Sequence, residues 1–349
     1  MPRKVIFPLL ALGALLVGAG LLLVSSRRTP AGRSPAPGLR GVAWLPAESA
    51  VVAGIEIAEL RQQDWLWGLV NKATGSVKAD SEYEAFINAT GFDYTRDLDR
   101  VWLGLFGSGW KTPTTGVAEG HFARDRILDY ARRQNARVHR HQGIEIHEVR
   151  TLARAPRQEE HVFAFAFLDD THLAFGTGAE QAAMVVDCWL GRAPAVGTDE
   201  PRRAELERLV AGHQLWVVNQ TAKGEPPGLA RRLEVESLRA LVTRWVIGVR
   251  VDEKGLELEA TAYFHDPAQA EPFHAKLGAI VFLGQVALGG SSDEVPRLLR
   301  DTLENVKINR KGETLKLQVL VEPRVVSALL RTAPAGALQP GTLLPQRTD

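Results

Sequence analysis

The sequence predicts an α+β fold, with two similar halves of antiparallel β-hairpins, helices packed on one face, and a single transmembrane helix before them. Three observations favour this fold. The N-terminus carries a long uncharged run, hairpin patterns alternate with helix patterns along the body, and a strand–turn–strand–helix unit occurs twice near the C-terminus.

The N-terminal run, from Val5 to Val24, contains 20 residues and no charge. At about 1.5 Å per residue a helix of this length spans about 30 Å, the thickness of a bilayer's hydrocarbon core. The run is longer than the apolar core of a cleaved signal peptide. Arg27 and Arg28 follow it closely and make a poor context for cleavage. A lipoprotein needs a cysteine just after the run, whereas the only cysteine is Cys188. We therefore expect an uncleaved anchor in the lipid bilayer.

The orientation of this anchor follows from the flanking charges. Arg3 and Lys4 precede the run, and four arginines follow it by residue 40, so the positive-inside rule is nearly balanced. A short basic tail before a first apolar segment usually stays inside. We expect a single-pass protein of the bacterial inner membrane with its body in the periplasm.

Composition divides the chain into an anchor, a Pro/Gly/Arg-rich tether, a first α+β domain, a second α+β domain and a flexible tail, at 1–26, 27–40, 41–198, 199–331 and 332–349. The hydrophobic content of 45% and charged content of 24% suit a globular body with a core. The net charge of +1 gives no overall field that would attract nucleic acid, which we do not expect as a partner.

Periodicity predicts the elements of the first domain in order. Strands are expected at 51–57, 100–106 and 116–122, helices at 59–74, 82–89, 124–133 and 179–190, and hairpins at 137–149 and 161–175. In the second hairpin Phe163, Phe165 and Phe167 share one face by the strand period of two, and we interpret this stripe as core.

The second domain is expected to begin, after a joint at 192–201, with a strand at 215–219 and a helix at 229–241. A hairpin at 246–264, helices at 268–286 and 295–302, a hairpin at 306–321 and a helix at 324–330 follow. An internal repeat relates 249–258 to 306–315, at an offset of 57 residues. Each copy has a Lys-Gly turn, whose glycine supplies a left-handed residue, and a proline that opens the next helix.

Three histidines form the best metal candidate: His139, His141 and His147. If Gln142-Gly143 is a two-residue turn, His147 lies on the opposite face from the other two, so the imidazoles do not converge. The same register makes Arg140 and Glu145 a cross-strand ion pair. We predict no metal site.

The other motifs are weaker. The acidic run from Asp93 to Asp99 lacks the spacing of a calcium loop, and it and Asp169-Asp170 suit turns and helix caps. Gly176-Thr-Gly178 lacks the third glycine of a phosphate loop and follows a hairpin strand. We therefore predict no cofactor and no catalytic residue.

Tryptophans near expected loops and helix faces are candidates for an interface, because exposed aromatic side chains mark contact surfaces. The candidates are Trp65, Trp67 and Trp110. The alternative interpretation is that these tryptophans are buried in the core.

Five short motifs, at turns and strand starts, resemble a family of uncharacterised bacterial envelope proteins, a domain of unknown function: Leu45-Pro-Ala-Glu-Ser, Thr90-Gly-Phe-Asp, Asp97-Leu-Asp, Glu119-Gly-His-Phe and Gly143-Ile-Glu-Ile. The resemblance implies one N-terminal anchor, a duplicated α+β body and an exported location. It implies no catalytic residues.

These observations predict a non-catalytic, single-pass membrane-anchored envelope protein that acts as a scaffold or accessory subunit of a membrane protein complex. The alternative is a periplasmic binding module for a lipid, peptide or glycan in the groove between the two halves. A hydrolase is a third hypothesis, for which a pair such as His121 flanked by Glu119 is too generic to serve as the site.

Overall fold

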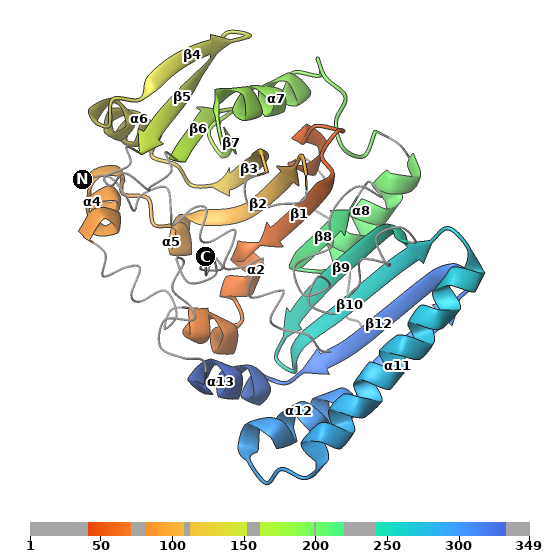
Figure 1. Ribbon diagram of the computed structural model, residues 1–349. Helices are drawn as coiled ribbons and strands as arrows, with labels where there is room; N and C mark the ends of the chain where they lie inside the picture. The colour runs from red at the N-terminus through yellow and green to blue at the C-terminus, as the bar shows by residue number, and fades with distance from the viewer. Residues whose placement is uncertain are drawn as a thin grey trace, which may run out of the picture. The chain divides into compact units, whose positions relative to one another are not determined.

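The computed structural model describes residues 41–70, 81–107, 112–151, 161–198, 200–219 and 242–332. The predicted anchor, the tether, the helix expected at 229–241 and the tail beyond Thr332 lie outside the described residues. The described chain is a mixed α+β structure built on antiparallel strands, as predicted (Figure 1).

The chain folds as two compact units. Within the described residues, the first unit comprises 41–62 and 81–219, and the second comprises 63–70 and 242–332. This grouping differs from the predicted division at residues 198 and 199 in two places. The segment 200–219 belongs to the first unit, and a short helical stretch at 64–70, early in the chain, belongs to the second.

The first unit contains η1 (Val42–Trp44), β1 (Val51–Glu56), α2 (Ile57–Arg61), α4 (Ser81–Thr90), α5 (Tyr94–Asp97), β2 (Leu98–Leu105), β3 (Thr114–Gly120), α6 (Arg124–Arg133), β4 (Arg137–His141), β5 (Ile144–Thr151), β6 (His161–Phe167), β7 (His172–Gly176), α7 (Ala179–Trp189), α8 (Glu200–Gly212) and β8 (Leu215–Asn219). Its strands lie in the order β8-β1-β2-β3-β7-β6-β5-β4, and each neighbouring pair is antiparallel.

The main differences from the prediction in this unit concern two helices. The helix expected at 59–74 is interrupted, because α2 ends at Arg61 and helix resumes only at residue 64. α8 is a helix that the periodicity does not predict. Its buried apolar seam is narrow, with Leu206 and Leu209 as its buried hydrophobic side chains in an otherwise charged segment.

Helical segments reach both faces of the sheet in this unit. α7 covers one face, where the Thr115 hydroxyl donates to the Gln181 carbonyl over 2.7 Å and Val185 is fully buried. The predicted phenylalanine stripe lies on the opposite face, and there the Arg124 guanidinium of α6 lies 5.2 Å from the ring centre of Phe167. The stripe is confirmed, and the expectation of helices on one face only is wrong for this unit.

Two buried tryptophans pack beside β1. Gly54 on β1 lies directly opposite Trp102 on one side and Trp216 on the other, so all three share a face. A Cβ atom at Gly54 would lie 2.4 Å from the Trp216 indole. The absence of a side chain at this position lets the indole lie flat against β1.

The second unit contains, besides 64–70, β9 (Val242–Asp252), β10 (Gly255–Phe264), α11 (Pro267–Gly289), α12 (Glu294–Glu304), β11 (Lys307–Lys311), β12 (Thr314–Val321) and α13 (Pro323–Thr332). The strands lie in the order β11-β12-β10-β9, all antiparallel. Gly255 and Gly312 have φ of +136° and +59°, as the repeat predicts, and prolines open α11 and α13.

α11 is, among the described residues, the one helix long and apolar enough to cross a membrane by length and composition, and its apolar window has no buried residue. It lies in the middle of the chain. The predicted N-terminal anchor lies outside the described residues, so the structure lends it no support and it stays a prediction.

Candidate functional site

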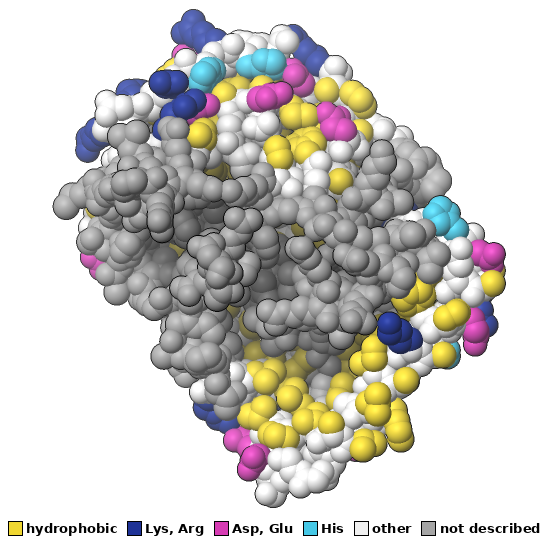
Figure 2. Space-filling view, in the orientation of Figure 1, with side chains coloured by type: hydrophobic (Ala, Val, Ile, Leu, Met, Phe, Trp, Pro, Cys, Tyr) yellow, Lys and Arg dark blue, Asp and Glu magenta, His cyan; other side chains and the backbone are white. Residues whose placement is uncertain are grey.

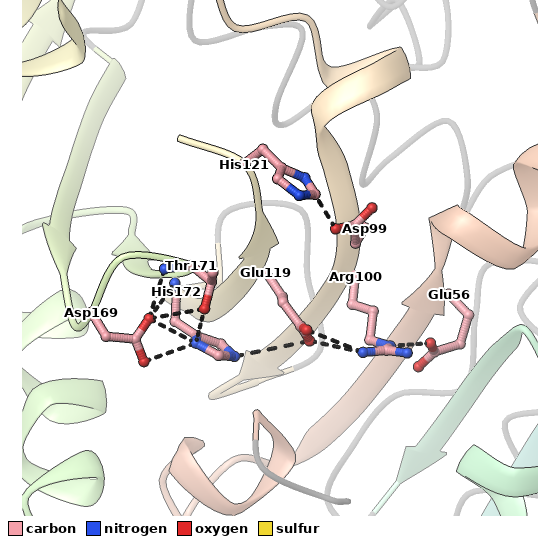
Figure 3. A network of polar contacts seen from close by, with 8 residues as sticks. All are labelled: Glu56, Asp99, Arg100, Glu119, His121, Asp169, Thr171 and His172. Atoms are coloured by element: carbon pink, nitrogen blue, oxygen red, sulfur yellow. Dashed lines mark hydrogen bonds and ion pairs between the residues drawn. The ribbon is translucent and has the colours of Figure 1, made fainter. Parts of the chain in front are cut away.

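A row of charged side chains crosses the first unit's sheet. Glu56 on β1 lies opposite Arg100 on β2, Arg100 lies opposite Glu119 on β3, and Glu119 lies opposite His172 on β7. Because directly opposed residues of antiparallel strands point to the same face, the four side chains form one line with Asp169 at its end (Figure 3). We call these five residues the polar row.

Arg100 joins the two carboxylates beside it. Its Nε lies 2.5 Å from Glu56 Oε2, and its Nη1 donates to both oxygens of Glu119 at 3.1 Å. Glu56 is buried, with an exposed fraction of 4%. Burial raises the pKa of Glu56 above its ordinary value, although the hydrogen bond and charge of Arg100 oppose the rise. The guanidinium is therefore the group that makes a buried carboxylate tolerable here.

His172 closes the other end of the row. Its Nδ1 lies 2.9 Å from Asp169 Oδ1 and 3.0 Å from the Thr171 hydroxyl, and its Nε2 lies 3.9 Å from Glu119 Oε2. The Trp44 ring packs edge-on at 4.9 Å. Burial acts to raise the pKa of the Asp169 carboxyl, but bonds from the Thr171 N–H and from His172 hold it below its ordinary value.

The chemistry available to the polar row is limited by this geometry. A nucleophile–base–orienter arrangement places the hydroxyl on one ring nitrogen and the carboxylate on the other. At His172 the hydroxyl and the carboxylate share Nδ1, and the Nε2 side faces another carboxylate. The row suits charge compensation across four strands and the β6–β7 turn.

The structure separates the pair that the hydrolase hypothesis would need. Glu119 joins the polar row, whereas the His121 ring is 79% exposed and its Nδ1 lies 3.5 Å from Asp99 Oδ2 (Figure 3). The two side chains therefore contact different partners. They do not form a common site.

The histidine hairpin has the predicted register. Arg140 lies opposite Glu145, with an ion pair of 3.1 Å, and Val138 lies opposite His147. His147 stacks on Phe165 with ring centres 5.3 Å apart, and burial lowers its pKa. His141 Nε2 lies 2.7 Å from Asp187 Oδ1. Within the part of the chain that the structure describes, no three His, Cys, Asp or Glu residues are grouped so that they could hold a metal ion.

The acidic turns have the predicted structural roles. Asp93 caps α5 by accepting from the Thr95 N–H over 2.9 Å, and Asp97 accepts from the Asp93 N–H over 2.8 Å. Asp169 accepts from the N–H groups of Thr171 and His172, both over 2.8 Å. Gly178 is the N-cap of α7 and follows a strand whose neighbours are antiparallel.

The candidate interface tryptophans are only partly described. Trp65 and Trp67 are half-buried in the helical stretch at 64–70, and Trp110 lies outside the described residues. The Trp65 Nε1–H donates to the Asp252 carbonyl over 3.0 Å within the second unit. Their role as an interface stays a prediction.

Among the described residues, most of the exposed large hydrophobic side chains lie on α11, and periodicity alone does not reveal their exposure. Four side chains of α11, Ile280, Phe282, Leu283 and Val286, have exposed fractions of 39%, 62%, 62% and 60%. We call them the outer face of α11. Hydrophobic side chains gather over this part of the second unit (Figure 2). The available signal was the absence of any charge from Leu277 to Ser292.

Comparisons with known proteins find little. No protein-family profile and no curated protein matches the chain. Solved structures of a protein named TP0453 are similar. Crystal form I has a TM-score of 0.45 and 10% identity, covering 84% of this chain and 98% of that one. Crystal form III has a TM-score of 0.48 and 10% identity, covering 83% and 97%. Similarity at this level carries no argument about function.

Proposed function

We propose that the chain is a non-catalytic, single-pass membrane-anchored envelope protein that acts as a scaffold or accessory subunit of a membrane protein complex. The observation that carries the proposal is the outer face of α11. Four large apolar side chains exposed on one helix need an apolar environment, because exposed apolar patches of this kind mark contact surfaces. An anchor at Val5 to Val24 would bring the body next to a bilayer, which contains such an environment.

The polar row supports the non-catalytic part of the proposal. Its carboxylates bind Arg100 or His172, and its one histidine is held by Asp169 and Thr171. Groups that satisfy each other in this way compensate buried charge, whereas a reactive site presents a base to a separate nucleophile.

The test is gentle detergent extraction of native membranes, purification through a C-terminal tag and mass spectrometry of co-eluting proteins. We expect a stoichiometric membrane partner. The matched control carries Leu15→Arg and Leu16→Arg, which interrupt the apolar run, and we expect it to leave the membrane in alkaline carbonate and to lose the partner. Elution of the native protein alone would remove the subunit proposal.

A further inference from the structure

α11 packs on the second unit with one side only. Phe273 contacts Phe264 with ring centres 5.3 Å apart, and Ala270 is fully buried. Near the other end of the helix, Gln285 Nε2 donates to the Leu303 carbonyl of α12 over 3.0 Å. These contacts fix which side of the helix faces the unit and hold it there along most of its length.

The opposite side of α11 is apolar. In an ordinary surface helix of a water-soluble protein, the side that faces solvent is polar. Phe282, Leu283 and Val286 follow one another at the spacing of a single helix face and are each 60% exposed or more. Charged side chains are confined to the N-terminal half of the helix, where Glu271 pairs with Arg310 at 2.6 Å and Lys276 is exposed. The helix therefore changes from polar to apolar along its axis.

We infer that the C-terminal half of α11 lies in the surface of a lipid bilayer, with its outer face towards the acyl chains. This inference rests on the proposed function, because the anchor brings the body to the bilayer. A 14-residue tether between residues 27 and 40 reaches about 40 Å if extended, which holds the body close to the lipid at a high effective concentration.

The contacts of α11 distinguish lying in the surface from spanning it. A spanning helix would have to leave Phe264 and the Leu303 carbonyl, whereas a helix in the interface keeps both and buries only its outer face. Lys276 stands at the boundary of the apolar half, where a lysine can reach lipid phosphates.

The side chains favour lipid over a second copy of the chain. Helix pairs that pack closely within a membrane place small residues at the contact. On the outer face of α11 the adjacent Phe282 and Leu283 are both 62% exposed. Phenylalanine and leucine are the residues that interfacial helices insert among acyl chains.

The experiment uses the full chain in phosphatidylcholine–phosphatidylglycerol vesicles, with Cys188→Ala as background. An environment-sensitive fluorophore is attached at Phe282→Cys and, as matched control, at Glu253→Cys in the exposed β9–β10 turn of the same unit. We expect shorter-wavelength emission at 282, quenched at least about twofold by lipids with a nitroxide on the acyl chain, and no quenching at 253. Emission from a water-exposed fluorophore at 282, or shorter-wavelength emission without lipid quenching, would overturn the inference; the second result would indicate a protein contact.

A second variant separates this inference from the proposed function. Leu283→Glu with Val286→Glu, added to the Phe282→Cys chain, removes most of the apolar outer face. Because both side chains are exposed, we expect unchanged folding by circular dichroism and loss of the lipid quenching at 282. Carbonate extraction reports the anchor independently. A parent Phe282→Cys chain that resists carbonate but shows no lipid quenching at 282 contradicts the inference and leaves the anchor intact. A chain that carbonate extracts, yet is quenched at 282 in vesicles, contradicts the anchor and supports the inference.

Discussion

Arg100 is the residue that compensates the negative charges at the centre of the polar row. It contacts the buried Glu56 and the half-buried Glu119 at once, and Glu119 in turn faces His172. A buried ion pair adds little net stability over apolar residues, but the loss of one partner leaves the other charge uncompensated. The contribution of Arg100 is therefore visible only when Glu56 is still present.

We expect Arg100→Met to lower the free energy of unfolding by about 3 kcal/mol at neutral pH, the lower part of the range for a broken buried pair, because the guanidinium is partly exposed. Urea denaturation followed by tryptophan fluorescence measures this loss. In the double variant Glu56→Gln/Arg100→Met no charge is left uncompensated at position 56, so more than half of the lost free energy should return.

The loss should also depend on pH. Burial raises the pKa of Glu56, and removal of Arg100 removes the group that opposes the rise. A carboxyl whose folded-state pKa is raised favours folding below its ordinary pKa, and this contribution is lost as the pH rises through the folded-state value. Arg100→Met should therefore cost less stability near about pH 4 than near about pH 8. If the loss of unfolding free energy did not depend on pH and were the same in the double variant, Arg100 would contribute by packing and not by its charge.

Cys188 provides a second prediction about a single residue. Burial raises the pKa of its thiol to about 12, and its Sγ lies 3.6 Å from the Pro194 carbonyl. At about pH 8 such a thiol has about a thousandfold less thiolate than an ordinary cysteine. We expect no alkylation by iodoacetamide in the native protein within an hour, and complete alkylation in urea, measured by mass spectrometry. Rapid native alkylation would show that the α7 end opens readily.

Single elements were predictable where a local signal fixes them. The β4–β5 register follows from the two-residue turn at Gln142-Gly143, and the Lys-Gly turns of the repeat have the expected positive φ. α6 has the predicted bounds because its apolar positions recur at helical spacing. α8 has too narrow an apolar seam to give this signal.

The packing of Trp216 against Gly54 leads to a prediction about β1. Gly54→Ala places a methyl group 2.4 Å from the buried Trp216 indole, so we expect a loss of about 1–3 kcal/mol of unfolding free energy. Gly278→Ala in α11 is the matched control. No atom lies within 4 Å of its added Cβ, and alanine should stabilise the helix by about 0.5–1 kcal/mol. Equal effects of the two changes, measured by urea denaturation, would refute the packing argument.

At the scale of the whole molecule, the candidate sites depended on information that a single sequence does not contain. The polar row needs β3 to pair with β7. One helix and three strands separate the two in sequence, and no local pattern specifies that order. The assignment of 64–70 to the second unit likewise depends on distant contacts such as Trp65 with Asp252. Which apolar side of α11 is buried and which is exposed depends on how the helix packs against α12 and the strands.

The orientation of the whole chain in the membrane gives the last prediction. With Arg3 and Lys4 on one side of the apolar run and Arg27 and Arg28 on the other, the charge difference that sets orientation is small. We expect the body outside the cytoplasm. A membrane-impermeant maleimide should therefore label Glu253→Cys in intact cells with a permeabilised outer membrane. Cys188 is buried and should stay unlabelled.

The control for orientation removes the N-terminal charges. Arg3→Gln with Lys4→Gln leaves the arginines after the run as the dominant positive cluster, which should draw the body towards the cytoplasm and reduce labelling at residue 253. If position 253 is labelled only after the inner membrane is broken, the body is cytoplasmic, and the short basic tail does not determine orientation. In that case α11 would face the inner leaflet, whose anionic lipids would attract Lys276.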